Sequence, residues 1–476
     1  MAQSIKKGLA WTAIEKFSVQ GVQFILGIII ARFITPSEYG VLGVIMVFIN
    51  ISQVFIESGL GSALIYRNNL EEKDLQTTFT FNIAFSLLIF IILFCTAGLI
   101  ESFFSLENLA SYLRVSIIVL ILNSFLVVPT AILQVKMNFK SIAITNFSAT
   151  LVSGGLGCVA AIYGFGVWAL ILQLLSKGVV QAFLLNILCK WKPRLKFFKD
   201  SFLSMYRYSL AIFGTSCITK LTGEGISFFI AKILTPYSLG IFTRANQFAS
   251  LTGTSLGSIF STVLFPVFSS RRDGEGNFND IYNKTVVYQG LVIIPIFALL
   301  AVLSKPIIIL LLTEKWIDVV PVLQILAVGR ILSTISTVTE QAICASGRSD
   351  LEFKQQFYKI VLKVICFIIG FKWGLNGIAI ADAVSTFLSF YITNFFARRC
   401  EGFSVKGQTI QLLPFIVAAA ISSVVSLFVI SCIDSIVLSL VAGFSTFVLI
   451  YFILMFFFER NLMRDINNII KGFMKQ

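Results

Sequence analysis

The sequence contains no histidine, and its charged side chains are scarce. Asp, Glu, Lys and Arg make up 13% of the 476 residues, about half of their share in soluble globular domains. The lack of histidine removes the commonest general base and the commonest zinc ligand. The eight cysteines show no CxxC or other metal-type spacing and lie mostly in apolar runs. We interpret them as small buried hydrophobic residues. The sequence therefore predicts no metal site, no cofactor and no enzyme.

Apolar side chains predominate in the sequence. The chain is 57% hydrophobic, with 48 phenylalanines and a mean hydropathy of +0.91. Such a surface must face something other than water. The apolar runs are too long, and lack the alternation, for membrane strands, so we predict an all-α integral membrane protein. The net charge of +14 sits in short loops, which indicates membrane topology and no nucleic-acid partner.

Fourteen segments reach the roughly 20 mostly apolar residues that a helix needs to cross a bilayer. No segment between them is long enough to form a soluble domain. We therefore predict about 14 transmembrane helices, at 8–33, 40–64, 77–100, 112–135, 141–163, 166–190, 208–234, 240–266, 286–304, 318–345, 355–373, 375–397, 410–431 and 435–458.

The distribution of Lys and Arg predicts the orientation of these helices. If the N-terminus lies in the cytoplasm, 24 of the 37 cations fall in cytoplasmic segments and seven fall within spans. Cytoplasmic loops of membrane proteins carry this kind of excess. An odd number of spans would disturb the pattern, so both termini are predicted to be cytoplasmic. The outer segments hold only six cations: Arg32, Arg114, Lys232, Lys305, Lys315 and Lys372.

A ten-residue segment occurs twice, 200 residues apart. Ala31–Gly40 (ARFITPSEYG) returns as Ala231–Gly240 (AKILTPYSLG), with seven positions identical or similar. Two weaker echoes follow in the same order, at 58–62 with 254–258 and at 164–170 with 374–380. An offset of six spans gives parallel repeats, which is a transporter architecture. The alternative is a coincidence between two Thr-Pro turns.

The repeat predicts three parts of the chain. These are a six-helix lobe over 1–207, a second six-helix lobe over 208–405, and a terminal two-helix pair with a cytoplasmic tail over 406–476. The binding site of such a carrier lies between its two lobes.

Cations inside spans are costly, so each is a candidate for substrate binding. By helical rise, Lys177, Lys220 and Arg330 come near the midplane, Arg244 lies toward the outside, and Lys16 lies in the cytoplasmic half. These five are the predicted substrate-binding cations. Structural roles are the alternative for each of them. Lys220, for example, has a carboxylate four residues later in the sequence, which could neutralise it.

Two further sets of charges occur within the predicted spans. Lys359 and Lys363 could extend to the inner interface. Four carboxylates are candidates for proton or sodium coupling, with structural pairing as the alternative: Glu57, Glu224, Glu340 and Asp382.

Several of these segments together resemble a known family. Trp11, Ala31–Gly40, Glu57–Leu64 and Tyr163–Leu170 resemble the polysaccharide transporter (Wzx-type repeat-unit flippase) family of the multidrug/oligosaccharidyl-lipid/polysaccharide (MOP) exporter superfamily. The resemblance implies two six-helix lobes around a cationic cavity that alternates between inward-open and outward-open states. It also implies a multi-pass protein of the bacterial cytoplasmic (inner) membrane.

The resemblance further implies a function. The cargo would be an undecaprenyl-pyrophosphate-linked oligosaccharide, moved from the cytoplasmic to the outer leaflet for surface polysaccharide such as the O-antigen of lipopolysaccharide. The partners would be this lipid-linked oligosaccharide, membrane lipids, and polysaccharide polymerase or assembly proteins.

Two other functions are alternatives for this sequence. Another MOP exporter, carrying a lipid-linked peptidoglycan precursor or acting as a drug/cation antiporter, would have the same repeat and cavity. A membrane polysaccharide polymerase needs a reactive constellation, usually in a large outer loop. The largest predicted outer segment, around 304–317, is short and offers no acid–base pair of side chains.

Overall fold

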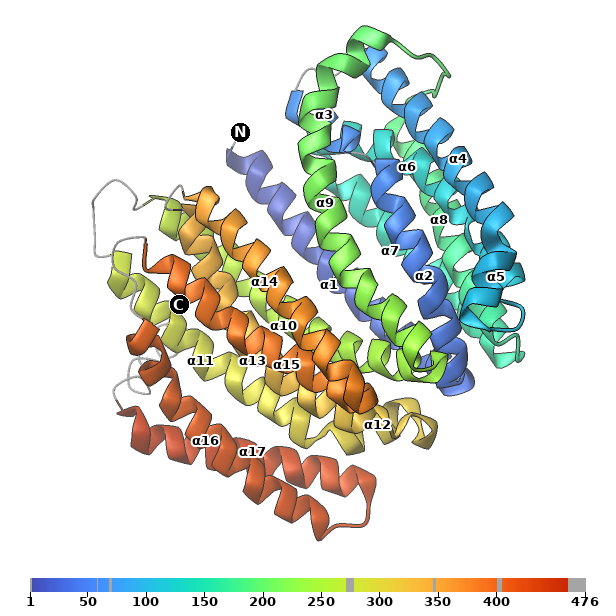
Figure 1. Ribbon diagram of the computed structural model, residues 1–476. Coiled ribbons are helices and arrows are strands. Elements are labelled where there is room, and N and C mark those ends of the chain that lie inside the picture. Colours follow the sequence, from blue (N-terminus) through green and yellow to red (C-terminus); the bar gives the residue numbers. More distant parts are fainter. Residues whose placement is uncertain are drawn as a thin grey trace. The chain divides into compact units, whose positions relative to one another are not determined.

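The computed structural model describes residues 2–57, 59–67, 71–270, 278–345, 348–399 and 405–460, and every regular element within these ranges is helical (Figure 1). The chain divides into two compact units, Met1–Gly240 and Ile241–Gln476. We refer to them as unit 1 and unit 2. The predicted all-α membrane fold is confirmed.

Unit 1 contains nine helices within the described ranges, and the first five residues of a tenth. Most are longer than the 20 residues that span a bilayer. Their bounds are α1 Ala2–Phe33, α2 Pro36–Glu57, α3 Leu60–Arg67, α4 Glu72–Phe104, α5 Leu109–Ser116, α6 Ile118–Val135, α7 Phe139–Ile162, α8 Val167–Cys189 and α9 Lys199–Ile233.

Unit 2 begins within the long helix α10, which extends from Pro236 to Ser270. Short helices connect its membrane-length helices at two places. The further bounds are α11 Phe278–Val302, α12 Ser304–Leu312, the 3-10 helix η1 Glu314–Trp316, α13 Val319–Ala345, α14 Ser349–Gly370, the 3-10 helix η2 Phe371–Trp373, α15 Gly374–Ala397, α16 Val405–Ser431 and α17 Ile436–Phe458.

All fourteen predicted segments are mostly helical. Among the described residues, eleven stretches are long and apolar enough to cross a membrane, and one of them, Asp350–Ala397, contains both α14 and α15. The predicted seventh and eighth spans coincide with α9 and α10. These helices have 35 residues each, but they are not among the eleven stretches that are apolar enough to cross a membrane. The count of fourteen therefore stays a prediction.

The boundary between the two units differs from the predicted lobe boundary. Position 207 lies within α9, and α9 packs against α2, α3 and α4 of unit 1. Spatial contacts and sequence repeats divide a chain by different criteria, so the three-part division stays a prediction. Several predicted features lie outside the described residues. They are Ser58 of the second echo, residues 400–404 just before the predicted end of the second lobe, and the tail beyond 460.

The two copies of the repeated segment adopt the same local turn. In each copy a helix ends, a threonine precedes a proline, and the next helix begins at that proline, where its missing N–H is not needed. The Thr35 hydroxyl accepts a hydrogen bond from the backbone N–H of Glu38 at 3.4 Å. In the second copy, the Thr235 hydroxyl accepts one from the N–H of Ser238 at 3.1 Å. The larger repeat remains a prediction.

These two turns also touch each other within unit 1. A Cβ atom at Gly40 would overlap the carbonyl oxygen of Pro236, and a Cβ atom at Gly240 would overlap the carbonyl oxygen of Pro36. Only glycine permits backbones to approach this closely. The reciprocal contact explains why both copies end in glycine.

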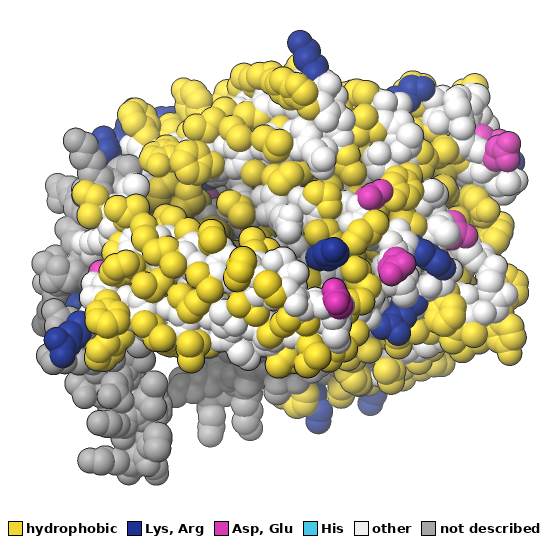
Figure 2. All heavy atoms as spheres, turned by 90° about the horizontal axis from the view of Figure 1, so that it is seen from below, with side chains coloured by type: hydrophobic (Ala, Val, Ile, Leu, Met, Phe, Trp, Pro, Cys, Tyr) yellow, Lys and Arg dark blue, Asp and Glu magenta, His cyan; other side chains and the backbone are white. Residues whose placement is uncertain are grey.

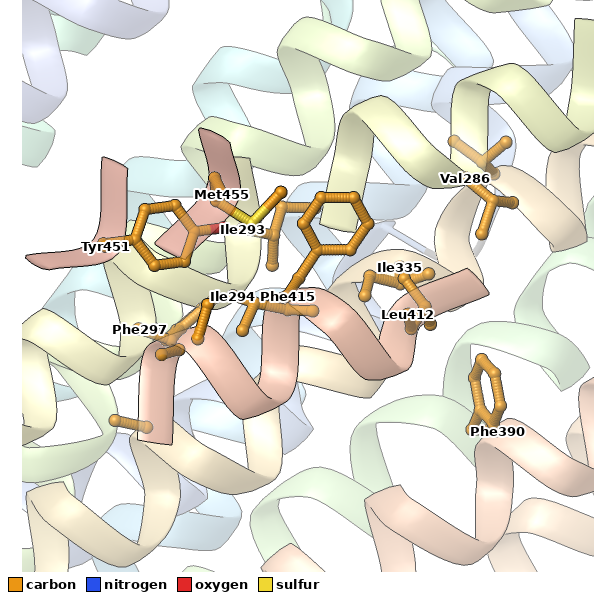
Figure 3. Close-up of a cluster of buried hydrophobic side chains, with 14 of the residues drawn as sticks. Val286, Ile293, Ile294, Phe297, Ile335, Phe390, Leu412, Phe415, Tyr451 and Met455 are labelled. Atoms are coloured by element: carbon orange, nitrogen blue, oxygen red, sulfur yellow. The ribbon is translucent and has the colours of Figure 1, made fainter. Parts of the chain in front are cut away.

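A buried cluster in the described part of unit 2 joins its last two helices to α11. In Figure 3, Phe297 of α11, Phe415 of α16, and Tyr451 and Met455 of α17 gather in one apolar cluster. Each is at most 3% exposed. The predicted terminal helix pair is thus a packed part of unit 2.

The outer surface is also apolar. On the face shown in Figure 2, hydrophobic side chains cover most of the described surface, and charged side chains are few. Exposed leucine, isoleucine and phenylalanine side chains occur on most of the long helices. This surface suits contact with lipid chains and not with water.

Candidate functional site

A buried carboxylate in unit 2 is shared by two cations. Asp382 of α15 lies 3.5 Å from the Arg330 guanidinium of α13 and 3.2 Å from the Lys363 ammonium of α14. The Asp382 side chain is 5% exposed. Arg330 also donates a 2.8 Å hydrogen bond to the Asn246 side-chain oxygen of α10. Four helices therefore contribute to one polar cluster. The cluster supplies the paired charges and hydrogen bonds that a buried carboxylate requires.

A second ion pair lies one helical turn along α14. The Lys359 ammonium is 2.5 Å from a carboxylate oxygen of Glu340 on α13. Lys359 and Lys363 are four residues apart, so they share a face of α14. The alternative that these lysines extend to the interface is not what the structure shows, because both are paired with carboxylates inside the helix bundle.

Arg330 and Glu340 line a polar cavity of about 610 Å³ within unit 2. The walls come from α10, α13 and α14 and carry mostly hydroxyl groups: Ser250, Thr254, Ser333, Thr334 and Thr337. Glu352 adds a second carboxylate. The cavity therefore combines one guanidinium with hydroxyls and carboxylates, and it can hold a polar ligand that carries negative charge at the Arg330 end.

Arg244 does not join this cavity. Its side chain is 5% exposed, and it donates a 2.6 Å hydrogen bond to Gln247 of the same helix. Its guanidinium lies 5.7 Å from the ring centre of Trp316 in η1, within the range of a cation–π contact. Arg244 and Arg330 thus have different partners, and only Arg330 lines the cavity, although the sequence predicted both to bind substrate.

Ser216, Lys220 and Ser227 are spaced so that they share one polar face of α9, which belongs to unit 1. Lys220 is exposed on it. Glu224, one turn later, accepts a 2.9 Å hydrogen bond from Asn50 of α2. An amide is thus the hydrogen-bond partner that the structure gives this carboxylate. Lys220 belongs to unit 1 and Arg330 to unit 2.

Glu57, at the end of α2, lines a cavity of about 500 Å³ in unit 1. It accepts a 3.0 Å hydrogen bond from Gln53, and Gln53 in turn accepts one from Asn123 at 3.0 Å. Gln134 and Ser216 also line this cavity. Amides and hydroxyls are the groups that bind sugar hydroxyls.

The last two predicted cations lie elsewhere in unit 1. Lys16 is exposed on α1 and Lys177 is half-buried on α8, and neither lines the cavity beside Glu57. The structure therefore does not gather the five predicted cations into one site within either unit.

Some polar contacts were not predicted from the sequence. Asn146 of α7 donates to Glu15 of α1 at 2.5 Å and accepts from Gln181 of α8 at 2.8 Å. Asn246, the partner of Arg330, was also missed. A polar amide inside an apolar span is the only sequence signal for these residues. Among the described residues, no group of three metal-binding side chains is found.

Long helices with buried ion pairs and polar cavities define a class of protein: polytopic membrane carriers, in which charges inside spans mark the path of a substrate. The family follows from comparison with known proteins. Residues 29–321 match the family model described as "Polysaccharide biosynthesis protein", and the chain belongs to this family. The resemblance to a polysaccharide biosynthesis family is confirmed.

Two curated relatives illustrate the family. The chain is 26% identical over 338 residues to the succinoglycan biosynthesis transport protein ExoT of Rhizobium meliloti (strain 1021), covering 71% of this chain and 68% of the relative. It is 24% identical over 399 residues to the lipopolysaccharide biosynthesis protein WzxC of Escherichia coli (strain K12), covering 81% of this chain and 80% of the relative. The names of these relatives describe polysaccharide transport or biosynthesis, and the family is one of polysaccharide biosynthesis, in agreement with the prediction of a transporter and not an enzyme.

A solved structure shares the fold. The lipid II flippase MurJ in an inward closed conformation matches with a TM-score of 0.77 and 17% identity, covering 95% of this chain and 99% of that chain. At this identity, the similarity concerns the fold alone. The chain is a multi-span membrane protein.

Proposed function

We propose that this protein moves an undecaprenyl-pyrophosphate-linked oligosaccharide from the cytoplasmic to the outer leaflet of the bacterial inner membrane, for the synthesis of a surface polysaccharide. The observation that carries the proposal is Arg330, a guanidinium inside a membrane helix that faces a polar cavity in a chain of the polysaccharide biosynthesis family. A pyrophosphate needs such a cation within a low-dielectric region.

The geometry around Asp382 suits an exchange of partners. Arg330 is the more distant of its two cations, at 3.5 Å against 3.2 Å for Lys363. A pyrophosphate oxygen can therefore replace Asp382 as the partner of Arg330, while Lys363 continues to neutralise Asp382. Neither charge is left unpaired in the membrane, so binding avoids the cost of a buried isolated ion.

The membrane potential supplies a driving force for this cargo. Moving one negative charge outward gains about 2.3 kcal/mol per 100 mV of inside-negative potential. A doubly charged headgroup gains twice that amount if the carrier adds no compensating charge. An acidic coupling residue is thus not required for export.

If coupling to protons occurs, unit 1 offers the better groups. Glu57 and Glu224 accept hydrogen bonds from the amides of Gln53 and Asn50, whereas Glu340 and Asp382 form ion pairs. Glu224 also interacts electrostatically with Lys220, but its direct contact is with an amide, so a proton on it or on Glu57 breaks no direct ion pair. We assign Glu57 and Glu224 as coupling candidates on this basis.

The cations and amides of unit 1 receive further roles in the proposal. Lys16, Lys177 and Lys220 of unit 1 attract the anionic headgroup as it enters or leaves. The amides of Gln53 and Asn123 in the unit 1 cavity bind sugar hydroxyls. Both termini lie in the cytoplasm, where glycan assembly proteins deliver the cargo, and a polymerase receives it on the outer side.

The test is complementation of a strain that lacks this protein. The Arg330→Ala and Lys220→Ala variants are expected to abolish surface polysaccharide while the protein level in the membrane stays the same. Arg348→Ala is the matched control, because Arg348 forms an exposed ion pair with Asp350 and is expected to support normal polysaccharide.

The outcomes distinguish an error in the assigned site residues from an error in the proposed function. Normal polysaccharide in both Arg330→Ala and Lys220→Ala would remove these residues from the site. Normal polysaccharide in the strain that lacks the protein altogether would contradict the function itself.

A further inference from the structure

A second hollow in unit 2 lies apart from the Arg330 cavity. It is a groove of about 1170 Å³ between α14 and α15. Its walls are apolar and aromatic, and several of these side chains are more than half exposed, including Phe353, Phe357, Tyr358 and Phe395. Large exposed apolar surfaces of this kind mark a binding surface for lipid or another apolar partner.

One end of the groove is cationic. Lys354 near the start of α14 and Arg399 just after the end of α15 both line it. The Arg399 guanidinium lies 5.6 Å from the ring centre of Phe395 and 5.4 Å from that of Phe396, so cation–π contacts hold it over the groove. None of the described residues that line the groove is acidic. Asp350 interacts electrostatically with Lys354 from outside the groove, so an anionic headgroup meets two positive charges and no negative charge within the groove itself.

The length of the groove corresponds to one leaflet. Along α14 its lining extends from Phe353 to Ile365, which is about 18 Å at the rise of an α-helix. One half of a hydrocarbon core of about 30 Å is about 15 Å. The aromatic side chains cluster near the cationic end, as they do at membrane interfaces. The distribution of Lys and Arg predicts this end to be cytoplasmic.

We propose that the α14–α15 groove is a binding site for an anionic phospholipid of the cytoplasmic leaflet. The acyl chains lie along the groove, and Lys354 and Arg399 bind the phosphate. A polyprenyl chain fits less well, because its length exceeds one leaflet. This site is independent of the transport function proposed above.

The test measures lipid binding to the purified full-length protein by native mass spectrometry. Phosphatidylglycerol and phosphatidylcholine with identical acyl chains are titrated separately. Wild type is expected to bind phosphatidylglycerol more tightly than phosphatidylcholine. The double variant Lys354→Gln/Arg399→Gln is expected to bind phosphatidylglycerol roughly 30-fold more weakly, since each cation near a membrane surface contributes about 1 kcal/mol.

Two matched controls separate the groove from general surface charge and from misfolding. Lys372→Gln removes an exposed lysine at the other end of the α14–α15 pair and is expected to leave phosphatidylglycerol binding unchanged. Val361→Trp fills the groove and is expected to weaken binding, whereas Ile368→Trp, on an exposed position of α14 outside the groove, is not. Elution of every variant as a monodisperse peak in size-exclusion chromatography verifies folding.

Three outcomes would overturn the proposal. The first is equal phosphatidylglycerol binding in wild type and the double variant. The second is an equal loss in Lys372→Gln, which would indicate charge alone. The third is displacement of phosphatidylglycerol by undecaprenyl phosphate at an equal concentration, which would assign the groove to the polyprenyl chain of a substrate.

Discussion

Asp382 shows at the residue scale how this protein keeps charge inside the membrane. One carboxylate, 5% exposed, faces Arg330 and Lys363 from two other helices. Removing one member of a buried ion cluster leaves the others without compensation, which costs more than the cluster contributes. The stability of unit 2 and the proposed binding of substrate therefore involve the same few atoms.

We expect Asp382→Asn to destabilise the protein by about 3–5 kcal/mol, because two partly buried cations lose their shared, buried partner. The measurement is unfolding of the purified protein in detergent. Asp350→Asn is the control, since Asp350 also pairs with an arginine, Arg348, but both side chains are about half exposed. It is expected to change stability little, as exposed ion pairs do.

The double variant Asp382→Asn/Lys363→Met is expected to recover part of the lost stability, because it removes one unpaired cation together with its carboxylate. Equal stability of Asp382→Asn and wild type would contradict a stabilising role for the cluster.

At the scale of elements, the two Thr-Pro turns and the polar helix α9 carry the most information. Each turn could be predicted from the sequence, because proline and threonine start a helix through local contacts. Their mutual contact at Gly40 and Gly240 could not, because it joins residues 200 positions apart. Likewise, the polar face of α9 could be predicted from residue spacing, whereas the bond between Glu224 and Asn50 depends on how α9 packs against α2.

We expect Gly40→Ala to destabilise the protein by about 1–3 kcal/mol, because the new methyl group overlaps the Pro236 backbone. The same measurement on Gly240→Ala is expected to give a similar loss. Gly98→Ala is the control. Gly98 lies on α4 with no atom near the position of a Cβ, and alanine there is expected to be neutral or slightly stabilising. A normal melting temperature for Gly40→Ala would contradict the close contact.

At the scale of the whole molecule, the distribution of Lys and Arg predicts an even number of spans with both termini in the cytoplasm. The described helices agree with each predicted segment, but the orientation is a property of the chain in a membrane. It needs a measurement in cells.

The native Cys432 is exposed in the turn after α16 and offers a labelling site for that measurement. We expect a membrane-impermeant maleimide to label it in intact cells, because the turn between α16 and α17 is predicted to lie outside. Cys432→Ser should abolish this signal. A cysteine introduced at Lys192, in the predicted cytoplasmic segment between α8 and α9, should react only after permeabilisation. The reverse pattern would invert the topology.

The sequence by itself determined that the chain is a bundle of membrane helices and where each helix lies. The reason is physical: within lipid, a backbone must satisfy its own hydrogen bonds, so a long apolar segment has to be helical. Family membership followed from local segments such as Ala31–Gly40. Tertiary structure alone decided which charges meet. Lys359 pairs with Glu340, and Lys363 and Arg330 pair with Asp382, because ion pairs between helices depend on packing that no local pattern records.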